Sequence, residues 1–362
     1  MKKDEFVNQL RRLVEIRSVS EDRDENKKLV GYVSSLISKK AKIKIWSNND
    51  ADILLASNVE TMSPDVAFLV HGDVVSGSDN LFKLKISGDK LSGRGVSDMK
   101  FSIPIGICLL NEWIEKNKTA SFSFVVTTDE ELGGFNGAKR LAEEFKFKPK
   151  LLIVPDGGDN FELVFKSKGV IHLLIESYGR SAHASEPWLG KSAITELIKL
   201  SDLLEKKYGK NSIEPNWNIT YNIGQIKAGE STNQICDYGF MKVDFRFPER
   251  NRANDILKEI NDLVGKYNLD LRVSVMVSGE ATYTDPRLEE VKEFVKILER
   301  GVKRKIKAIG DCGASDARYF KDSPTLMIKP NGGEIHADGE WIFLSSCLIY
   351  YELISKYLER YK

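Results

Sequence analysis

Histidine and carboxylate side chains follow short apolar runs at several points of this 362-residue chain, and together they could bind metal ions. The runs cover residues 66–70, 122–126, 151–154 and 325–328. Runs this short indicate buried strands, and the carboxyl ends of strands in an open sheet form one ligand-binding edge. The candidate ligands follow such runs or lie in glycine-containing loops, and they are His71, Asp98, Glu131, Asp156 and His336.

The chemistry of this ligand set favours an open catalytic metal site. Imidazole and carboxylate donors without a thiolate suit zinc, cobalt or manganese. Two cations ~3.5–4 Å apart need a bridging carboxylate, terminal ligands and a bridging water. Taken singly, each residue also has a structural interpretation: a core histidine, a solvated acidic pair, or an aspartate that caps a helix or turn. Their joint occurrence after strands of one sheet favours the metal site.

Two further acidic residues stand next to the ligands. Glu130 precedes Glu131, and from an extended chain its side chain would point elsewhere, where it could take a proton from water. Asp73, two residues beyond His71, could orient that imidazole. The sequence therefore predicts a general base and a supporting carboxylate beside the metals.

Composition excludes several classes of protein. Hydrophobic residues make up 41% and charged residues 30%, an ordinary balance for a folded domain. The formal net charge of +1 does not indicate electrostatic binding to a nucleic acid or an anionic membrane. The basic run 303–307 indicates a solvated helix end. We find no apolar stretch near the ~20 residues of a membrane span and no signal-peptide pattern. The four scattered cysteines favour a reduced setting, so we expect a soluble, cytoplasmic protein.

Two patterns of elements alternate along the chain. The first part combines helical periodicity near residues 6–14, 29–37, 101–116 and 134–146 with the short strands, which predicts an α/β domain with a mostly parallel sheet flanked by helices. A last helix is expected from about Trp341 to Tyr361. The middle reads as strands at 169–178, 217–227, 236–247 and 269–277 with helices at 191–206 and 252–267, the β-α-β-β-α-β order of a ferredoxin-like domain. We expect a catalytic domain from 1–165 and 280–362, interrupted by an inserted lid or dimerisation domain at 166–279.

As a set, the motifs resemble those of the co-catalytic zinc aminoacylase and exopeptidase family. That family includes succinyl-diaminopimelate desuccinylase, acetylornithine deacetylase, aminoacylase, glutamate carboxypeptidase and several dipeptidases. The similarity covers nearly the whole chain. The motifs are His71-Gly-Asp73, Gly93-Arg-Gly-x-x-Asp98-Met-Lys100, Asp129-Glu130-Glu131-x-Gly133-Gly134 and the late His336.

The resemblance implies a role for each matching residue. His71 and Asp156 would bind one zinc, Glu131 and His336 the other, and Asp98 would bridge them. Glu130 would be the general base and later the general acid, with Asp73 behind His71. The resemblance also implies a cis peptide bond between Asp98 and Met99.

The inserted domain carries matching segments as well. Gly179-Arg-Ser-Ala-His183 resembles the segment whose histidine polarises the scissile carbonyl, in its own active site or in that of a partner subunit. Asn233 and Arg246 resemble positions that contact substrate, and each has an equally good structural interpretation. Ser315 lies in Gly313-Ala-Ser-Asp-Ala-Arg318, which resembles a pocket loop of the family, although Ala314 replaces a usual threonine.

The resemblance predicts a hydrolase of amide bonds in small peptides or N-acyl amino acids, with two Zn²⁺ (or Co²⁺ or Mn²⁺) and a homodimer formed through the inserted domain. Aspartate at position 156 is more usual in the amino- and dipeptidases than in the deacylases, which favours an exopeptidase or dipeptidase. A deacylase of the desuccinylase or acetylornithine deacetylase type is the alternative. A non-catalytic relative is a further alternative, although such proteins usually lose ligands that are all present here.

Overall fold

Four buried strands pair in parallel at the centre of the larger sheet. The computed structural model describes residues 1–361 and divides into two units. Unit 1 comprises Met1–Phe165, Thr284–Asp311 and Ser315–Lys362, and unit 2 comprises Lys166–Tyr283 and Cys312–Ala314. The catalytic and lid roles expected for the two parts of the chain stay predictions.

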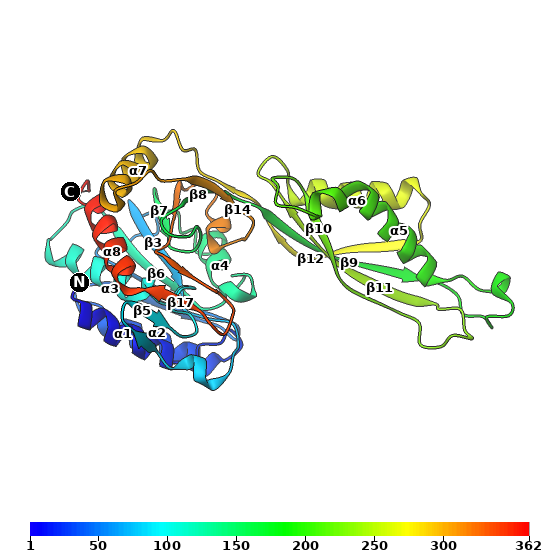
Figure 1. Cartoon of the computed structure of the whole chain (residues 1–362), viewed down its shortest axis with the longest axis horizontal. Helices are drawn as coiled ribbons and strands as arrows, with labels where there is room; N and C mark the ends of the chain where they lie inside the picture. Colours follow the sequence, from blue (N-terminus) through cyan, green and yellow to red (C-terminus); the bar gives the residue numbers. More distant parts are fainter. Residues whose placement is uncertain (362) are drawn as a thin grey trace. The chain divides into compact units, whose positions relative to one another are not determined.

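The large sheet has the strand order β1-β2-β6-β3-β7-β15-β8-β13, with β14 paired to β8. All of it belongs to unit 1 except β13 and the last two residues of β8, which the division assigns to unit 2. Strands β6, β3, β7 and β15 are parallel neighbours, while β1, β2 and β8 add antiparallel pairs toward the edges. The prediction of a mixed α/β fold with a mostly parallel sheet is therefore confirmed (Figure 1). The strands are β1 Lys42–Ser47, β2 Asp52–Ser57, β3 Val66–His71, β6 Phe122–Thr127, β7 Leu152–Val154, β8 Leu163–Ser167, β13 Thr282–Tyr283, β14 Ala308–Asp311 and β15 Thr325–Met327.

Helices cover both faces of this sheet because its central strands alternate apolar side chains between two cores. Phe68 and Val70 belong to the core beneath α1, α2, α3, α7 and α8. Ala67 and Leu69 face the second core, beneath α4. The helices are α1 Lys3–Glu15, α2 Arg23–Leu36, α3 Ser102–Glu115, α4 Ala138–Glu143, α7 Glu289–Val302 and α8 Leu344–Leu358.

A small antiparallel sheet of order β16-β17-β5-β4 adds to unit 1. The last helix expected from about Trp341 to Tyr361 is present as α8, but it starts three residues later, at Leu344, because Trp341–Phe343 forms strand β17. Backbone pairing of Trp341 with Ser92 overrides the helical periodicity there. The strands are β4 Lys85–Ser87, β5 Lys90–Ser92, β16 Gly332–Gly333 and β17 Trp341–Phe343.

Unit 2 is built around a four-stranded antiparallel sheet of order β10-β11-β9-β12. Helices α5 and α6 pack on one face through Leu197, Leu200, Ile256 and Ile260. The chain order β-α-β-β-α-β and this strand order confirm the ferredoxin-like fold. The elements are β9 Gly169–Tyr178, α5 Ala193–Tyr208, β10 Thr220–Ala228, β11 Tyr238–Phe247, α6 Ala253–Lys266 and β12 Leu271–Gly279.

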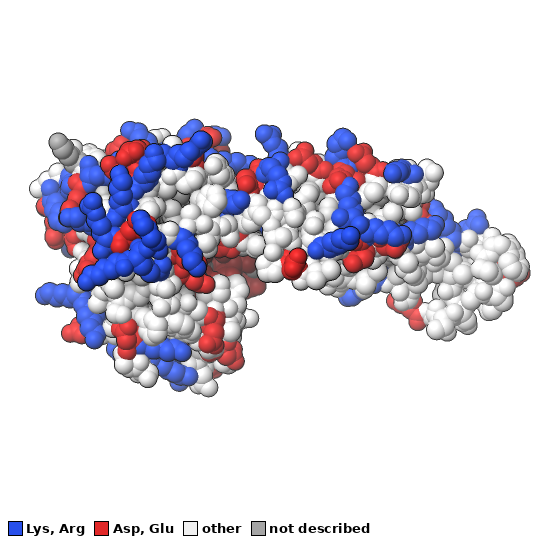
Figure 2. Space-filling model, turned by 45° about the horizontal axis from the view of Figure 1, so that its top comes forward, with Lys and Arg blue, Asp and Glu red and all other residues white. Residues whose placement is uncertain are grey.

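Several short 3-10 helices connect these elements: η1 Asp79–Phe82, η2 Glu130–Leu132, η3 Pro187–Leu189, η4 Gly209–Ser212 and η5 Asp316–Tyr319. On the face drawn in Figure 2, basic and acidic side chains intermingle over both units, as the net charge of +1 leads one to expect. Among residues 1–361, no helix has the length and apolar composition needed to cross a bilayer. Cys108, Cys236, Cys312 and Cys347 are free thiols.

Candidate metal centre

The expected ligands lie where strands of unit 1 end. His71 is the last residue of β3, Glu131 lies in η2 after β6, and Asp156 follows β7. Because β6, β3 and β7 are parallel neighbours, their carboxyl ends meet at one edge of the sheet. Asp98 lies in the loop after β5, and His336 in the loop between β16 and β17, so the small sheet contributes the remaining two.

Asp98 is the residue that the two halves of the site share. Its Oδ1 lies 3.1 Å from Nε2 of His71, and its Oδ2 lies 3.2 Å from Nε2 of His336. Nε2 of His336 also lies 3.0 Å from Oε2 of Glu131. Two groups therefore have all their ligand atoms within 4.8 Å of one another: His71, Asp98 and Asp156, and Asp98, Glu131 and His336.

The electrostatics of this cluster fit divalent cations. Burial, followed by the negative charge of Asp98, raises the pKa of Asp156 to about 7. Hydrogen bonds to Asp98 and Glu131 raise the pKa of His336 to about 10. Although burial acts to raise the pKa of Asp98, hydrogen bonds from His336 and His71 hold it well below its usual range. Closely packed carboxylates of this kind carry more negative charge than a protein interior tolerates alone, and bound cations would neutralise it.

Glu130 lies beside this cluster on a 3-10 turn. The expectation of an extended chain at Glu130–Glu131 was wrong, because residues 130–132 form η2. A 3-10 helix turns by about 120° per residue, which still directs the two side chains differently. Burial, and then the negative charge of Asp156, raise the pKa of Glu130 well above its ordinary value. A carboxylate whose pKa is raised in this way is a stronger proton acceptor than an ordinary glutamate, as a general base needs to be.

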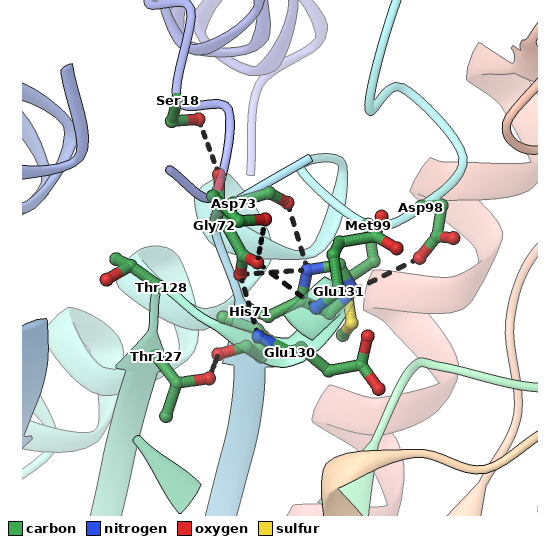
Figure 3. Close-up of polar contacts among 12 residues, drawn as sticks. Ser18, His71, Gly72, Asp73, Asp98, Met99, Thr127, Thr128, Glu130 and Glu131 are labelled. Atoms are coloured by element: carbon green, nitrogen blue, oxygen red, sulfur yellow. Dashed lines mark hydrogen bonds and ion pairs between the residues drawn. The ribbon is translucent and has the colours of Figure 1, made fainter. Parts of the chain in front are cut away.

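Asp73 organises the backbone around the cluster (Figure 3). Its Oδ1 accepts a hydrogen bond from the Glu130 N–H, and its Oδ2 accepts one from the Glu131 N–H, both at 3.2 Å. The hydroxyl of Ser20 donates to Oδ2 at 2.8 Å. Nδ1 of His71 lies 3.0 Å from the backbone carbonyl of Asp73 and 3.5 Å from its carboxylate, so the carbonyl is the closer partner of the imidazole.

The loop that carries Asp98 has a distinctive backbone. The Asp98–Met99 peptide bond is cis, as the family resemblance implies. Gly95 has a φ of +81°, and a Cβ there would lie 2.7 Å from a methyl carbon of Val74, so only glycine fits. This glycine lets the chain turn tightly into the segment that presents Asp98.

Three of the remaining candidates belong to unit 2. His183 is exposed, and its Nδ1 accepts a hydrogen bond from the Ser185 N–H at 3.2 Å and contacts the Ser185 hydroxyl at 2.7 Å. Asn233 is its neighbour, since the carbonyl of Asn233 accepts from the Ala184 N–H. Arg246 makes a bidentate ion pair with Asp244 on β11.

Ser315 lies in unit 1 and is buried. Its hydroxyl accepts from the Ala317 N–H at 3.3 Å and so caps η5. This contact gives the residue a structural role, and its part in substrate binding stays a prediction.

The structure also reveals buried charges near the ligands to which the sequence analysis assigned no role. Lys100 donates to the carbonyls of Leu13 and Ile16, each at 2.9 Å, and burial lowers its pKa to about 7. Arg94 and Glu340 form a buried ion pair of 3.1 Å. In the sequence, only the positions of Lys100, Arg94 and Glu340 within or near the motif segments could have indicated a role for them. Their partners are mostly backbone atoms, which no side-chain pattern marks.

Comparison with known proteins identifies the class and then the family. An α/β sheet with imidazoles and carboxylates gathered at its edge is the architecture of a metallohydrolase. The model of peptidase family M20/M25/M40 matches residues 67–360, and the chain belongs to this family. It is thus a hydrolase of a metallopeptidase family, which implies the use of divalent metal.

Curated relatives include both peptidases and deacylases. A probable carboxypeptidase of Aspergillus niger is 29% identical over 55% of this chain, and the match spans only 48% of that protein. A succinyl-diaminopimelate desuccinylase of Rickettsia bellii is 24% identical over 82% of each chain.

A tripeptidase of Staphylococcus aureus has the same fold, with a TM-score of 0.81, 18% identity and coverage of 99% of this chain and 98% of that one.

Proposed function

We propose that this protein binds two Zn²⁺ ions and hydrolyses an amide bond in a small peptide, as an exopeptidase or dipeptidase. The observation that carries the proposal is the position of Asp98, whose two oxygens contact two different imidazoles and which belongs to both ligand groups. His71 and Asp156 would hold one cation, Glu131 and His336 the other, and Asp98 would bridge them. Co²⁺ or Mn²⁺ could replace zinc with this ligand set.

In this proposal Glu130 moves the proton. When bound, the cations supply Lewis acidity that polarises a carbonyl and acidifies water. Glu130 takes a proton from the attacking water onto its carboxylate and returns it to the leaving amine. Its raised pKa supports this role, because a carboxylate with a higher pKa accepts a proton from water more readily.

His183 is proposed to stabilise the developing charge on the carbonyl oxygen. Two contacts from Ser185 occupy Nδ1, which favours the tautomer with the proton on Nε2. Nε2 can then donate a hydrogen bond to the oxyanion. Asn233 and Arg246 of unit 2, with Ser315 of unit 1, are proposed to contact the substrate.

A substrate panel tests the proposal and separates it from its main alternative. The Rickettsia relative supports a deacylase acting on an N-acyl amino acid as the second candidate. Zinc-loaded protein should be incubated with di- and tripeptides beside N-acetyl and N-succinyl amino acids. Cleavage of peptides supports the exopeptidase and preferential cleavage of the acyl compounds supports the deacylase, whereas inactivity on all of them with metal bound contradicts both.

The proposal assigns the second unit and the cellular setting as well. Residues 1–165 and 280–362 would form the catalytic domain, and residues 166–279 a lid that also forms a homodimer. The four free cysteines support a reduced cytoplasmic setting. Light scattering of the purified protein tests the dimer, and cell fractionation tests the compartment.

A further inference from the structure

Arg94 and Glu340 form an ion pair that connects the two loops carrying Asp98 and His336. Nη1 of Arg94 lies 3.1 Å from Oε2 of Glu340, and both side chains are almost fully buried, with 3% and 2% of their surface exposed. The two residues are 246 positions apart in the chain. Burial of two charges costs free energy that further hydrogen bonds must offset. Here Nη1 and Nη2 of Arg94 and both oxygens of Glu340 have additional partners, while Nε of Arg94 has none in the described part of the chain.

Glu340 binds the backbone of the Asp98 loop. Its Oε2 accepts from the Gly95 N–H at 2.9 Å, and its Oε1 accepts from the Ser97 N–H at 2.9 Å and the Asp98 N–H at 3.1 Å. Three contacts within four residues fix the path of this loop, and the last of them is made to the shared ligand itself.

Arg94 binds the loop on the other side. Its Nη1 donates to the carbonyl of Ala337 at 3.2 Å, and its Nη2 donates to the carbonyl of His336 at 3.3 Å. His336 has a φ of +64°, a left-handed conformation that is uncommon for residues other than glycine. The guanidinium therefore contacts the backbone of a candidate ligand where the loop adopts this uncommon conformation.

We infer that Arg94 and Glu340 are positioning residues that set the separation of Asp98 from His336 and so determine how tightly the Asp98–Glu131–His336 group binds its cation. The inference rests on the proposed metal centre. The ion pair contacts the backbone of two ligands of the Asp98–Glu131–His336 group, Asp98 and His336. In the His71–Asp98–Asp156 group it contacts only Asp98. The two cations should therefore respond unequally when the pair is broken.

Metal titration of chelator-stripped full-length protein tests this inference. Zn²⁺ is titrated against a chromophoric competitor, with wild type expected to bind two equivalents. In Glu340→Gln we expect one equivalent to weaken by about 10–100-fold, the usual effect of losing a residue that supports metal ligands, and the other to change far less. Glu196→Gln is the matched control, because it removes a buried carboxylate of unit 2 that also accepts a backbone N–H.

The affected cation is identified in two backgrounds. Glu340→Gln should reduce the affinity of the remaining site strongly in Asp156→Asn, which retains the His336 group, and weakly in His336→Ala, which has already lost it. Equal effects in both backgrounds, or a lowered melting temperature with unchanged zinc affinities, would show that the pair is merely structural.

A second variant keeps the test decisive if Glu340→Gln does not fold. Arg94→Lys retains the positive charge but loses the planar guanidinium group, which contacts Glu340 and the carbonyls of His336 and Ala337 at the same time. We expect it to weaken the same equivalent, and unchanged zinc binding in folded Arg94→Lys overturns the inference. Wild type that binds no metal would instead contradict the proposed function.

Discussion

The carboxylate of Asp73 holds the main chain of Glu130 in place through a hydrogen bond of 3.2 Å from the Glu130 N–H. The residue expected to support a metal ligand therefore also supports the expected base. The second oxygen of Asp73 does the same for Glu131. One side chain thus fixes both the residue that would move the proton and a residue that would bind metal.

Glu130→Gln should separate proton transfer from metal binding. The amide keeps the shape of the side chain but cannot accept a proton, so we expect turnover to fall by about 10²–10⁴-fold. Metal content, measured by elemental analysis, should stay at two equivalents. Glu143→Gln on α4 is the control and should leave turnover unchanged. Nearly full turnover in Glu130→Gln would mean that another group is the base.

Removal of a single imidazole should remove a single cation. In His336→Ala the group of His71, Asp98 and Asp156 is intact, so we expect the metal content to fall from two equivalents to one after dialysis. His172→Ala, in unit 2, should keep both. Retention of two tightly bound equivalents by His336→Ala would contradict the assigned ligands.

The metal-free protein should be less stable at alkaline than at acidic pH. The pKa of Asp156 is raised to about 7 and that of His336 to about 10, so each group contributes stability that is present at low pH and lost as the pH rises through its folded-state value. For Asp156 the loss falls between about pH 4 and 7, and for His336 between about pH 6.5 and 10. The raised pKa values of His71 and Glu130 act in the same direction. Lys100, whose pKa is lowered to about 7, acts in the opposite direction above that pH, so the expected net loss reflects several raised groups against one lowered group.

Melting temperatures of chelator-treated protein at pH 6 and pH 8.5 measure this effect, and we expect the lower value at pH 8.5. Bound zinc should reduce the difference, because cations then take the place of the protons. Asp156→Asn should reduce the dependence of the melting temperature on pH below pH 7. A metal-free protein that becomes more stable toward pH 8.5 would contradict the proposed electrostatics.

Lys100→Met should destabilise unit 1. The ammonium donates to the carbonyls of Leu13 and Ile16 at the end of α1, and its loss deprives these buried acceptors of a partner at a cost of about 1–3 kcal/mol. Urea unfolding gives the free energy of unfolding directly. Lys116→Met, which alters an exposed ion pair with Glu112, is the control and should change little. Equal stability of the two variants would argue against this role of Lys100.

His183→Ala should lower turnover without changing the metal content. Loss of a donor to the oxyanion commonly costs about 10²–10³-fold in turnover. Trp188→Ala, an exposed residue of the same segment, is the control. Unaltered turnover in His183→Ala would remove it from the mechanism.

A mixture of His183→Ala and Glu130→Gln proteins shows in which subunit His183 acts. The two variants are denatured, mixed and refolded together so that mixed dimers form. Activity that returns places the histidine in the active site of the partner subunit, whereas mixed dimers that stay inactive place it in its own.

The sequence was informative where function depends on side-chain type. His71 and Asp156 could be proposed as ligands because each follows an apolar run, and the structure places both at the ends of parallel strands. The fold of unit 2 could be predicted because its strands alternate cleanly. Strand β1 was not predicted, although it alternates in the same way, because it is a half-exposed edge strand of mostly charged and apolar residues.

The residues that hold the ligands could not be predicted in the same way. Glu340 acts mainly through backbone N–H groups, which every residue has, so no pattern of side chains marks its partners. The strand Trp341–Phe343 depends on pairing with β5, some 250 residues earlier in the chain, and local periodicity cannot report it. The 3-10 turn at Glu130 similarly depends on Asp73, which binds its backbone.

The order of strands in the large sheet also has a consequence for how the protein is made. Strand β15 lies between β7 and β8, yet the ribosome produces it only after residues 166–283 of unit 2. All four strands of the sheet in unit 2 are synthesised before β15, which must pair between β7 and β8 to complete the large sheet. Nascent chains should therefore acquire protease resistance in the middle first, and the cation-binding edge should be completed only when the late segments with β15 and His336 have emerged.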